Sequence, residues 1–394
     1  MEKILVTQSE TACPPLDALL QAEGFVVVRA RRVEDALGRL AQGAALWLLE
    51  AEQLAAADAE FRQLVNRRCC ELEVFCLLFS SGGMSVEAMA KLAPWAAAIT
   101  LPATDGGLVL GRVRDQLSIR RLAYERNLAQ ARLLEKQEEY RINLESASSI
   151  QNSLLPQRLP NIGGLRFASR FIPCDKVGGD IYNVLQIDED TLMLYLLDVS
   201  GHGVSSAMIT VSVFQSLSLQ TGQIVKQRCA VPPYYRIPSP AEVLASLDRE
   251  FPFERFEKFF TITYLLLNIH TGQLRYSSAG HPAPLLIGSS GEWQLLAEGG
   301  AIIGVDGANP YDEGEVMLQP GDRLYLYSDG VTEHMNENGE LFGVERLVRR
   351  LGEQRRRPLD SACGKLVEGL QDFGHNGRFR DDVTLFACEF GENG

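Results

Sequence analysis

Long apolar runs are absent from this sequence of 394 residues. A membrane-spanning helix needs about 18 or more consecutive apolar residues, and no such run occurs. The N-terminus, MEKILVTQSE, also lacks the basic stretch, apolar core and cleavage site of a signal peptide. We therefore expect a cytoplasmic protein. The content of 46% apolar and 23% charged residues excludes a disordered or collagen-like chain, and the length predicts two or three domains.

C-x-x-C pairs and an excess of basic residues are also missing. None of the 8 cysteines forms a C-x-x-C pair, so the usual zinc and thioredoxin-like motifs are excluded and structural thiols are favoured. The formal net charge is −13, and residues 159–394 carry 20 basic and 31 acidic side chains. Nucleic-acid binding usually requires a basic face, and no basic helix-turn-helix occurs, so a DNA-binding response regulator is disfavoured.

Five short apolar runs alternate with helix-like stretches in the first 112 residues. The runs lie at 4–6, 25–28, 45–49, 74–79 and 97–101. The helix-like stretches lie near 14–23, 32–42, 52–68, 84–93 and 105–118. Repeated strand–helix units with short apolar strands predict a parallel, doubly wound sheet.

This pattern resembles the receiver domain of two-component response regulators, but the residues that carry receiver chemistry have changed. Gln8 and Ser9 stand where an acidic pair should hold magnesium, and Glu50 replaces the phosphoacceptor aspartate. Leu101 precedes Pro102 in place of the lysine, while Ser80 or Ser81 can supply the hydroxyl. We interpret residues 1–112 as a pseudo-receiver that serves packing or partner binding. An unrelated flavodoxin-like domain and a still-phosphorylatable receiver are the alternatives.

Residues 113–155 are rich in Arg, Glu, Gln, Leu and Ala and contain no Gly or Pro, which predicts one long connecting helix. A heptad frame fits this helix imperfectly, because three of its seam positions are polar. The pattern predicts a parallel dimeric coiled coil; the alternative is a helix packed on its own domain. The apolar seam residues are Ile119, Leu122, Ala129, Leu133, Tyr140, Ala147, Ile150 and Leu154, and the polar ones are Arg126, Lys136 and Asn143.

Four acidic motifs follow in the C-terminal part, each next to an apolar strand-like run. They are VGGDIY with Asp180, LLDVSGHG with Asp198, YLYSDG with Asp329, and RDDVTLF with Asp381 and Asp382. Hard divalent cations prefer oxygen ligands, and two ions about 3.5–4 Å apart can activate water and clamp a phosphoryl group. Each motif alone is weak, since an Asp-Gly pair is most often a turn. Their ordered set predicts carboxylates that converge on a metal cleft.

In this order, residues 148–391 resemble the PPM-type (protein phosphatase type 2C) metal-dependent serine/threonine phosphatases. They are most similar to the bacterial sporulation and stress-response branch, which acts in sigma-factor partner switching. The resemblance rests on residues 149–156, 178–182, 198–203, 278–282 (SAGHP), 328–330, 342–343 and 381–384. It implies an αββα sandwich over residues 156–394, in which two antiparallel sheets are covered by helices and hold the metals between them.

The resemblance also implies roles for individual residues. Asp180 would bridge two Mn²⁺ or Mg²⁺ ions, and Asp198 with the backbone carbonyl of Val199 would bind one of them. Asp329 and Asp381 would complete the shell of the other ion. Water would then attack phosphoserine or phosphothreonine in line, without a covalent enzyme intermediate.

Other polar residues near these motifs have weaker signals. Asp382 is expected to support the site or cap a strand. His202 is a candidate general acid, because its ordinary pKa suits neutral pH, although its position differs from the acid of eukaryotic relatives. Arg170 is expected on the surface of a strand rather than on phosphate. His281 is expected to order its turn, His334 to be an outer-shell or exposed residue, and His270 and His375 to lie in loops. Residues 220–240 are either a flap over the protein substrate or a solvated loop.

The sequence therefore predicts a dimeric phosphoprotein phosphatase regulated by a pseudo-receiver. The resemblance implies a phosphorylated STAS-type anti-sigma-factor antagonist as substrate, and a regulatory protein could bind the pseudo-receiver. We expect no nucleic-acid or membrane partner. The alternative is a non-catalytic adaptor, or pseudophosphatase, which retention of all four metal carboxylates disfavours. Glu50 could also act as a permanent acidic mimic that keeps the phosphatase active.

Overall fold

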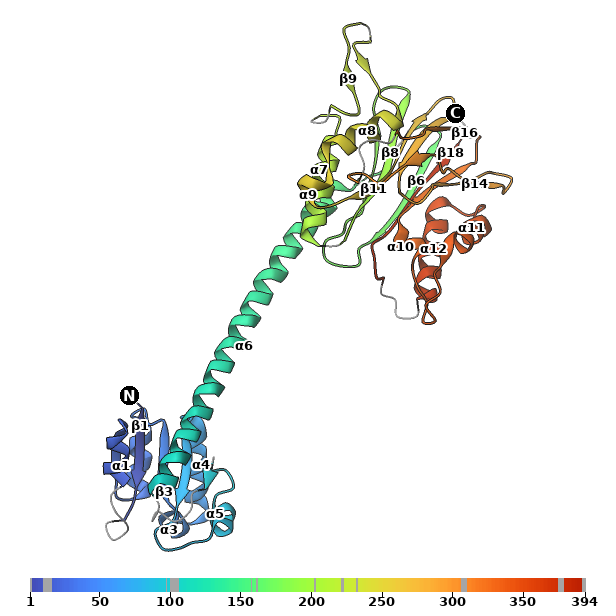
Figure 1. The fold of residues 1–394 in the computed structure, drawn as a ribbon. Helices are drawn as coiled ribbons and strands as arrows, with labels where there is room; N and C mark the ends of the chain where they lie inside the picture. The colour runs from blue at the N-terminus through green and yellow to red at the C-terminus, as the bar shows by residue number, and fades with distance from the viewer. Residues whose placement is uncertain are drawn as a thin grey trace. The chain divides into compact units, whose positions relative to one another are not determined.

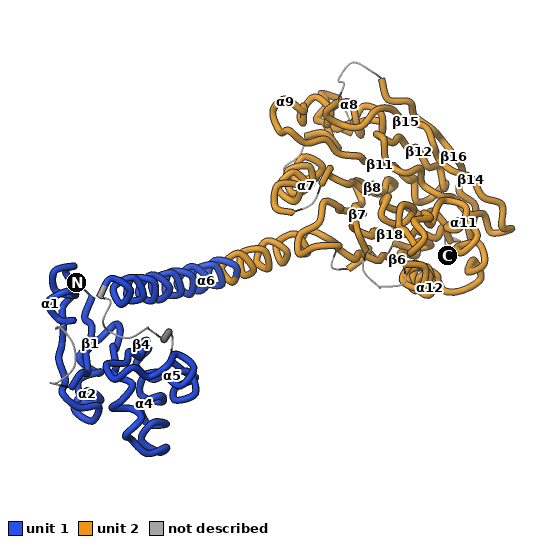
Figure 2. Tube along the Cα trace, turned by 60° about the horizontal axis from the view of Figure 1, so that its bottom comes forward, with its two compact units in different colours: residues 1–137 blue, residues 138–394 orange. Residues whose placement is uncertain are grey.

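The computed structural model describes residues 2–9, 16–96, 98–99, 106–156, 158–160, 162–201, 203–220, 223–231, 233–305, 310–374 and 379–391. The chain divides into two compact units, residues 1–137 and residues 138–394 (Figure 2). No helix in these described ranges has the length and apolar character needed to cross a membrane.

The first unit contains a five-stranded parallel sheet in the order β2-β1-β3-β4-β5. Each strand coincides with one of the five apolar runs, so the predicted doubly wound sheet is confirmed. The central strands are buried because apolar clusters pack on both faces of the sheet. The strands are β1 (Lys3–Thr7), β2 (Val26–Ala30), β3 (Leu46–Glu50), β4 (Phe75–Phe79) and β5 (Ala98–Ile99).

The helices of this unit agree with the predicted stretches except at 52–68. The structure has two helices there, because the Asp58 carboxylate accepts a hydrogen bond of 2.7 Å from the backbone N–H of Phe61 and caps a new helix. A single helix across this stretch was therefore a wrong prediction. The helices are α1 (Leu16–Ala22), α2 (Val33–Leu40), α3 (Ala51–Ala55), α4 (Ala59–Glu71) and α5 (Val86–Leu92).

The connecting helix α6 (Gly106–Leu154) is 49 residues long and begins before residue 113, the predicted start. It merges the expected last helix of the first unit with the connecting helix, since no proline separates them. Val109, Val113 and Leu117 are buried against the sheet of the first unit. The apolar seam residues Ile119, Leu122, Leu133, Tyr140 and Ile150 are exposed. The first turns of α6 therefore pack on the first unit. For the rest of the helix, the coiled-coil dimer stays a prediction.

The second unit is a sandwich of two mainly antiparallel sheets, as the resemblance implies. One sheet has the order β15-β12-β11-β8-β7, with β16 also paired to β12, and the other has the order β14-β13-β17-β18-β6. The first contains β7 (Ile181–Gln186), β8 (Thr191–Val199), β11 (Phe260–Asn268), β12 (Gln273–Ala279), β15 (Gly299–Gly300) and β16 (Gly314–Met317). The second contains β6 (Leu165–Ile172), β13 (Leu285–Ile287), β14 (Trp293–Leu295), β17 (Arg323–Tyr327) and β18 (Val383–Phe390).

Helices cover both outer faces of this sandwich (Figure 1). An apolar cluster of side chains from both sheets, including Leu194, Leu265, Leu326 and Phe386, fills the space between them. The fold therefore has four layers, and the αββα prediction is confirmed. The six-stranded sheet is covered by α7 (Val204–Ser216), α8 (Pro240–Glu250) and α9 (Phe253–Phe256). The five-stranded sheet is covered by α10 (Asp329–Thr332), α11 (Gly343–Glu353) and α12 (Leu359–Phe373).

Candidate active site

The predicted aspartates lie at one end of the sandwich. Asp180 directly precedes β7, and Asp198 is the last residue but one of β8. Asp329 begins α10 just after β17, and Asp381 lies two residues before β18. Since β7 contacts β18 and β8 contacts β17 across the sandwich, these strand ends meet. The structure thus brings together all four predicted aspartates, while their roles as metal ligands stay a prediction.

Two glycines allow the strand ends to approach this closely. A Cβ atom on Gly178 would lie 2.2 Å from Oδ2 of Asp382. On Gly179 it would lie 2.6 Å from the carbonyl oxygen of Val199 and 3.1 Å from Oδ1 of Asp198. Side chains at these positions would therefore separate the turn before Asp180 from both neighbouring motifs. The close backbone approach that the VGGD sequence predicts is confirmed.

Asp382 organises the turn that leads to Asp180. Its buried carboxylate accepts hydrogen bonds from the backbone N–H groups of Gly179, at 2.7 Å, and Cys174, at 2.9 Å. Its backbone carbonyl accepts a hydrogen bond of 3.0 Å from the Ser328 hydroxyl, next to Asp329. Asp382 therefore joins three of the four motifs through hydrogen bonds. Asp381 is exposed and keeps its carboxylate at the surface of the cluster.

Negative charge accumulates at the cluster. Burial raises the pKa of Asp180 well above its usual range, and the charges of Asp198 and Asp382 raise it further. Burial and the charges of Asp329 and Asp381 raise the pKa of Asp198 to about 7. Burial, followed by the charge of Asp381, raises the pKa of Asp329 to about 6. Carboxylates this close disfavour simultaneous ionisation unless a cation neutralises them.

The donor set suits a hard divalent cation. Asp180 accepts a hydrogen bond from the Thr384 hydroxyl at Oδ2, whereas its buried Oδ1 has no hydrogen-bond partner among the described residues. Carboxylate oxygens and the carbonyl of Val199 are the ligand types that Mg²⁺ and Mn²⁺ prefer. Within the described ranges, however, no group of three or more His, Cys, Asp or Glu side chains is arranged to hold a metal ion. The carboxylates converge without forming a closed ligand shell.

The histidines contribute less to this cluster than the aspartates. His281 is buried, its Nδ1 lies 2.8 Å from the Thr261 hydroxyl, and burial lowers its pKa to about 3. It therefore stays neutral and fixes the SAGHP turn. His334 is buried against the rings of Phe373 and Phe379, so it is not an exposed residue. His270 is exposed, with its Nε2 atom 3.2 Å from the Asp190 carboxylate, and His202 and His375 lie outside the described residues.

Arg170 is turned away from the carboxylates. Its guanidinium donates hydrogen bonds of 2.8 Å to the Asp360 carboxylate and 3.1 Å to the Asp360 carbonyl, in α12. The expectation that Arg170 does not bind phosphate stays a prediction.

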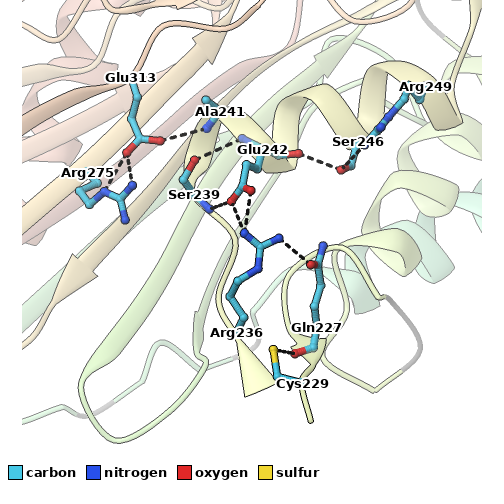
Figure 3. Close-up of polar contacts among 10 residues, drawn as sticks. All are labelled: Gln227, Cys229, Arg236, Ser239, Ala241, Glu242, Ser246, Arg249, Arg275 and Glu313. Carbon is cyan, nitrogen blue, oxygen red and sulfur yellow. Dashed lines mark hydrogen bonds and ion pairs between the residues drawn. The ribbon is translucent and has the colours of Figure 1, made fainter. Parts of the chain in front are cut away.

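The hairpin of β9 (Gln227–Arg228) and β10 (Tyr235–Arg236) lies in the segment considered as a substrate flap. Polar contacts hold it in place: Arg236 binds Glu242 and Gln227, and Glu242 also completes the N-terminal cap of α8 (Figure 3). The Tyr235 hydroxyl donates a hydrogen bond of 3.1 Å to Asp188, in the turn between β7 and β8. That turn is at the opposite end of the two strands from Asp180 and Asp198, so the hairpin is anchored away from the carboxylates.

The first-unit residues compared above with receiver positions form a hydrogen-bond network. The buried Glu50 carboxylate accepts hydrogen bonds from the backbone N–H and hydroxyl of Ser9, at 2.8 and 3.0 Å, and from the Ser81 hydroxyl. Neighbouring Glu52 accepts from the Ser80 hydroxyl. Serine side chains thus donate hydrogen bonds to both carboxylates, and the interpretation of this unit as a pseudo-receiver stays a prediction. Leu101, the residue at the lysine position, lies outside the described residues.

Sequence reasoning missed three residues that support the site. Thr384 binds the Asp180 carboxylate, Thr210 of α7 donates a hydrogen bond of 2.8 Å to the carbonyl of Gly179, and Gln151 of α6 binds the backbone of Gly178. Thr384 follows the RDD motif directly and was detectable as part of it. Thr210 and Gln151 lie in helices, where no local pattern distinguishes them from surface positions.

Comparisons with known proteins find relatives of the second unit. The family model of Stage II sporulation protein E (SpoIIE) matches residues 188–391. Phosphoserine phosphatase RsbP of Bacillus subtilis is 31% identical over 195 residues, which are 48% of this chain and 45% of RsbP. Phosphoserine phosphatase RsbU of the same organism is 27% identical over 260 residues, which are 64% of this chain and 71% of RsbU. This chain therefore spans less than half the length of RsbP.

A solved structure supports the fold of the second unit. The SiaA-PP2C domain of Pseudomonas aeruginosa superposes with a TM-score of 0.54 at 24% identity, over 65% of this chain and 98% of that domain. The matched residues contain Asp198, Asp329 and Asp381, and the matching structure has the layered fold described above. By the family model that covers more than half of its residues, the chain belongs to the SpoIIE family.

Proposed function

We propose that this protein is a divalent-metal-dependent phosphatase that removes phosphate from phosphoserine or phosphothreonine in a protein. The observation that carries the proposal is the convergence of Asp180, Asp198 and Asp329 with raised pKa values at the end of the sandwich. Strongly shifted carboxylates that gather in one place are characteristic of functional sites. The relatives RsbP and RsbU are named phosphoserine phosphatases, which supports this reaction.

The residues divide the work as follows. Mn²⁺ or Mg²⁺ ions would be held by the carboxylates of Asp180, Asp198, Asp329 and Asp381 and by the backbone carbonyl of Val199. Such ions, when bound, activate water and neutralise the charge of the phosphoryl group. Thr384 orients the Asp180 carboxylate, and Asp382 fixes the turn that carries it. The resemblance to the PPM-type phosphatases implies the same use of divalent metals.

The proposed substrate is a phosphorylated STAS-type antagonist of an anti-sigma factor. The resemblance to the bacterial sporulation and stress-response branch implies this substrate, and the likeness to RsbP and RsbU, both named phosphoserine phosphatases, supports a phosphoserine as the group removed. The excess of acidic over basic residues in the C-terminal part disfavours nucleic acid as a partner.

We further propose three functional parts: a pseudo-receiver over residues 1–112, a dimeric coiled coil over residues 113–155, and a phosphatase domain over residues 156–394. The exposed apolar seam of α6 supports the coiled coil. A regulatory protein bound to the pseudo-receiver would act through this helix. If Glu50 is a permanent acidic mimic, Glu50→Gln lowers phosphatase activity; unchanged activity and oligomeric state contradict that role.

A non-catalytic adaptor is the second candidate function. It is favoured by one observation, that the described carboxylates do not form a closed metal-binding group. An adaptor would bind its partner through the same sandwich without hydrolysing phosphate.

Hydrolysis of p-nitrophenyl phosphate separates the two candidates. The phosphatase proposal predicts Mn²⁺-dependent hydrolysis that Asp180→Asn abolishes. Asp360→Asn is the matched control, because Asp360 is an exposed partner of Arg170 in α12, outside the carboxylate cluster. No hydrolysis with any divalent cation, in a protein that folds normally, would favour the adaptor.

A further inference from the structure

Lys258 lies between α9 and β11 and reaches the loop that follows the second acidic motif. Its half-buried ammonium donates hydrogen bonds of 2.8 Å to the carbonyl of Ser200 and 3.3 Å to the hydroxyl of Ser206. It makes no ion pair with any residue in the described part of the chain. The Lys258 ammonium therefore interacts with the polar groups of Ser200 and Ser206 rather than with a carboxylate.

Ser200, the target of Lys258, directly follows Asp198 and Val199. Its backbone N–H donates a hydrogen bond of 3.0 Å to the carbonyl of Phe259, and its hydroxyl accepts one of 3.3 Å from the N–H of Phe259. The Ser206 hydroxyl donates a further hydrogen bond of 3.1 Å to the Ser200 carbonyl. Ser200 is thus fixed from two directions, by the Lys258–Phe259 segment and by the first turn of α7.

Two glycines in the loop after β8 widen the range of backbone conformations open to it, so its position depends on contacts such as those of Lys258. Gly201 and Gly203 have φ values of +76° and +89°, in the left-handed region that favours glycine. A Cβ atom on Gly201 would lie 3.2 Å from the Lys258 nitrogen, so the ammonium lies directly against the turn. Without the lysine, the Ser200 carbonyl keeps only the hydrogen bond from the Ser206 hydroxyl, while the two hydrogen bonds with Phe259 continue to hold the N–H and hydroxyl of Ser200.

The same helix also holds the other strand end of the site. Thr210 lies one turn after Ser206 on a buried face of α7 and donates a hydrogen bond of 2.8 Å to the carbonyl of Gly179, next to Asp180. Thus α7 contacts the Asp180 turn through Thr210 and the Asp198 strand end through Ser206. Lys258 donates hydrogen bonds to both Ser206 and Ser200 and so stabilises the contact between α7 and the end of the Asp198 strand.

We propose that Lys258 is a positioning residue of the carboxylate site, which fixes Asp198 and the Val199 carbonyl relative to Asp180 and thereby sets the affinity for divalent cations. The proposal rests on the proposed metal-dependent function. Lys258 acts through the Ser200 carbonyl and the Ser206 hydroxyl, without contacting the substrate. Groups that hydrogen-bond a metal ligand directly typically change metal affinity by roughly 10–100-fold when removed, and Lys258 acts on the ligands through the neighbouring backbone of Ser200.

The test compares Mn²⁺ binding by the full chain and its variants in isothermal titration calorimetry. Lys258→Met should weaken Mn²⁺ binding by roughly 10–100-fold. Lys258→Arg keeps the positive charge and the hydrogen-bond donors, so its Mn²⁺ affinity should fall less. Lys226→Met is the matched control: Lys226 also donates to a backbone carbonyl, that of Ile187, at 3.1 Å, at the opposite end of β7 and β8. High Mn²⁺ concentrations should restore hydrolysis of p-nitrophenyl phosphate by Lys258→Met with an unchanged KM.

Three results would overturn the proposal: wild-type Mn²⁺ affinity in Lys258→Met, an equal loss in Lys226→Met, or no Mn²⁺ binding by the wild-type chain. If Lys258→Met does not fold, Ser206→Ala tests the same contact and should weaken Mn²⁺ binding in the same direction. If the wild-type chain binds Mn²⁺ but hydrolyses no phosphate, weaker Mn²⁺ binding by Lys258→Met would support the role of Lys258, and only the phosphatase function would be contradicted.

Discussion

Gln151, near the end of α6, holds the peptide of Gly178 through two hydrogen bonds. Its side-chain nitrogen donates to the Gly178 carbonyl at 2.7 Å, and its side-chain oxygen accepts from the Gly178 N–H at 3.1 Å. Both residues are buried, and Gly178 lies two residues before Asp180. The last turns of the connecting helix are therefore joined to the turn that carries the central carboxylate.

Replacement of Gln151 by alanine should lower both phosphatase activity and thermal stability. The change leaves the buried N–H and carbonyl of Gly178 without partners, at a cost of about 1–3 kcal/mol for each group, and the turn before Asp180 can relax. Mn²⁺-dependent hydrolysis measured beside thermal unfolding checks this. Asn152→Ala, at an exposed neighbouring position, is the control, and equal activity in the two variants would contradict the role of Gln151.

Gly178→Ala should disrupt the site through steric conflict. The added Cβ atom would lie 2.2 Å from the Asp382 carboxylate, so either Asp382 or the Asp180 turn must move. Overpacking of this kind typically costs about 1–3 kcal/mol, and Mn²⁺ binding should weaken with it. Gly163→Ala serves as the control, because a Cβ atom there meets nothing within 4 Å. Unchanged Mn²⁺ affinity in Gly178→Ala would show that the described turn is incorrect.

The metal-free protein should lose stability as the pH rises. The pKa values of Asp198 and Asp329 are raised to about 7 and about 6, so the folded state holds protons that the unfolded state releases near pH 4. The stabilising contribution of the protonated groups is complete below about pH 4 and is lost as the pH rises to about 7. The Tm of EDTA-treated protein should therefore fall between pH 5 and pH 8.

Two additions make this pH dependence specific to the carboxylate cluster. Asp198→Asn should flatten the fall in Tm, since the amide does not ionise, and Mn²⁺ at pH 8 should raise the Tm of the wild-type protein. A Tm that rises with pH in EDTA, or an identical fall in Asp198→Asn, would contradict the electrostatic description of the cluster.

Leu133→Asp should convert a dimer into monomers. Leu133 occupies a seam position of the α6 heptads, where a buried carboxylate would oppose pairing of two helices. Leu134→Asp is the matched control, because the exposed fraction of Leu134 is 59% and that of Leu133 is 58%, but Leu134 is not a seam position. Sedimentation equilibrium checks both variants. A dimer that survives Leu133→Asp, or that is lost equally in Leu134→Asp, would exclude this seam as the interface.

The sequence predicted most of the architecture because its signals are local. Short apolar runs separated by helix patterns correspond to β1–β5, and the glycines of VGGD predicted the close approach at Asp180. The break at Asp58 was missed because one capping residue interrupts an otherwise continuous helical pattern. Gln151, Thr210 and Lys258 were missed because their partners are distant in sequence, and only the folded chain brings a lysine against Ser200.

Release of phosphate from phosphoserine-bearing STAS proteins tests the proposed function most directly. The purified chain with Mn²⁺ should dephosphorylate at least one member of a panel of such proteins, and Asp180→Asn should not, while Asp360→Asn should behave like the wild type. Mn²⁺ binding without release of phosphate from any phosphoserine protein, in the presence or absence of proteins that bind the first unit, would contradict the assignment as a phosphatase.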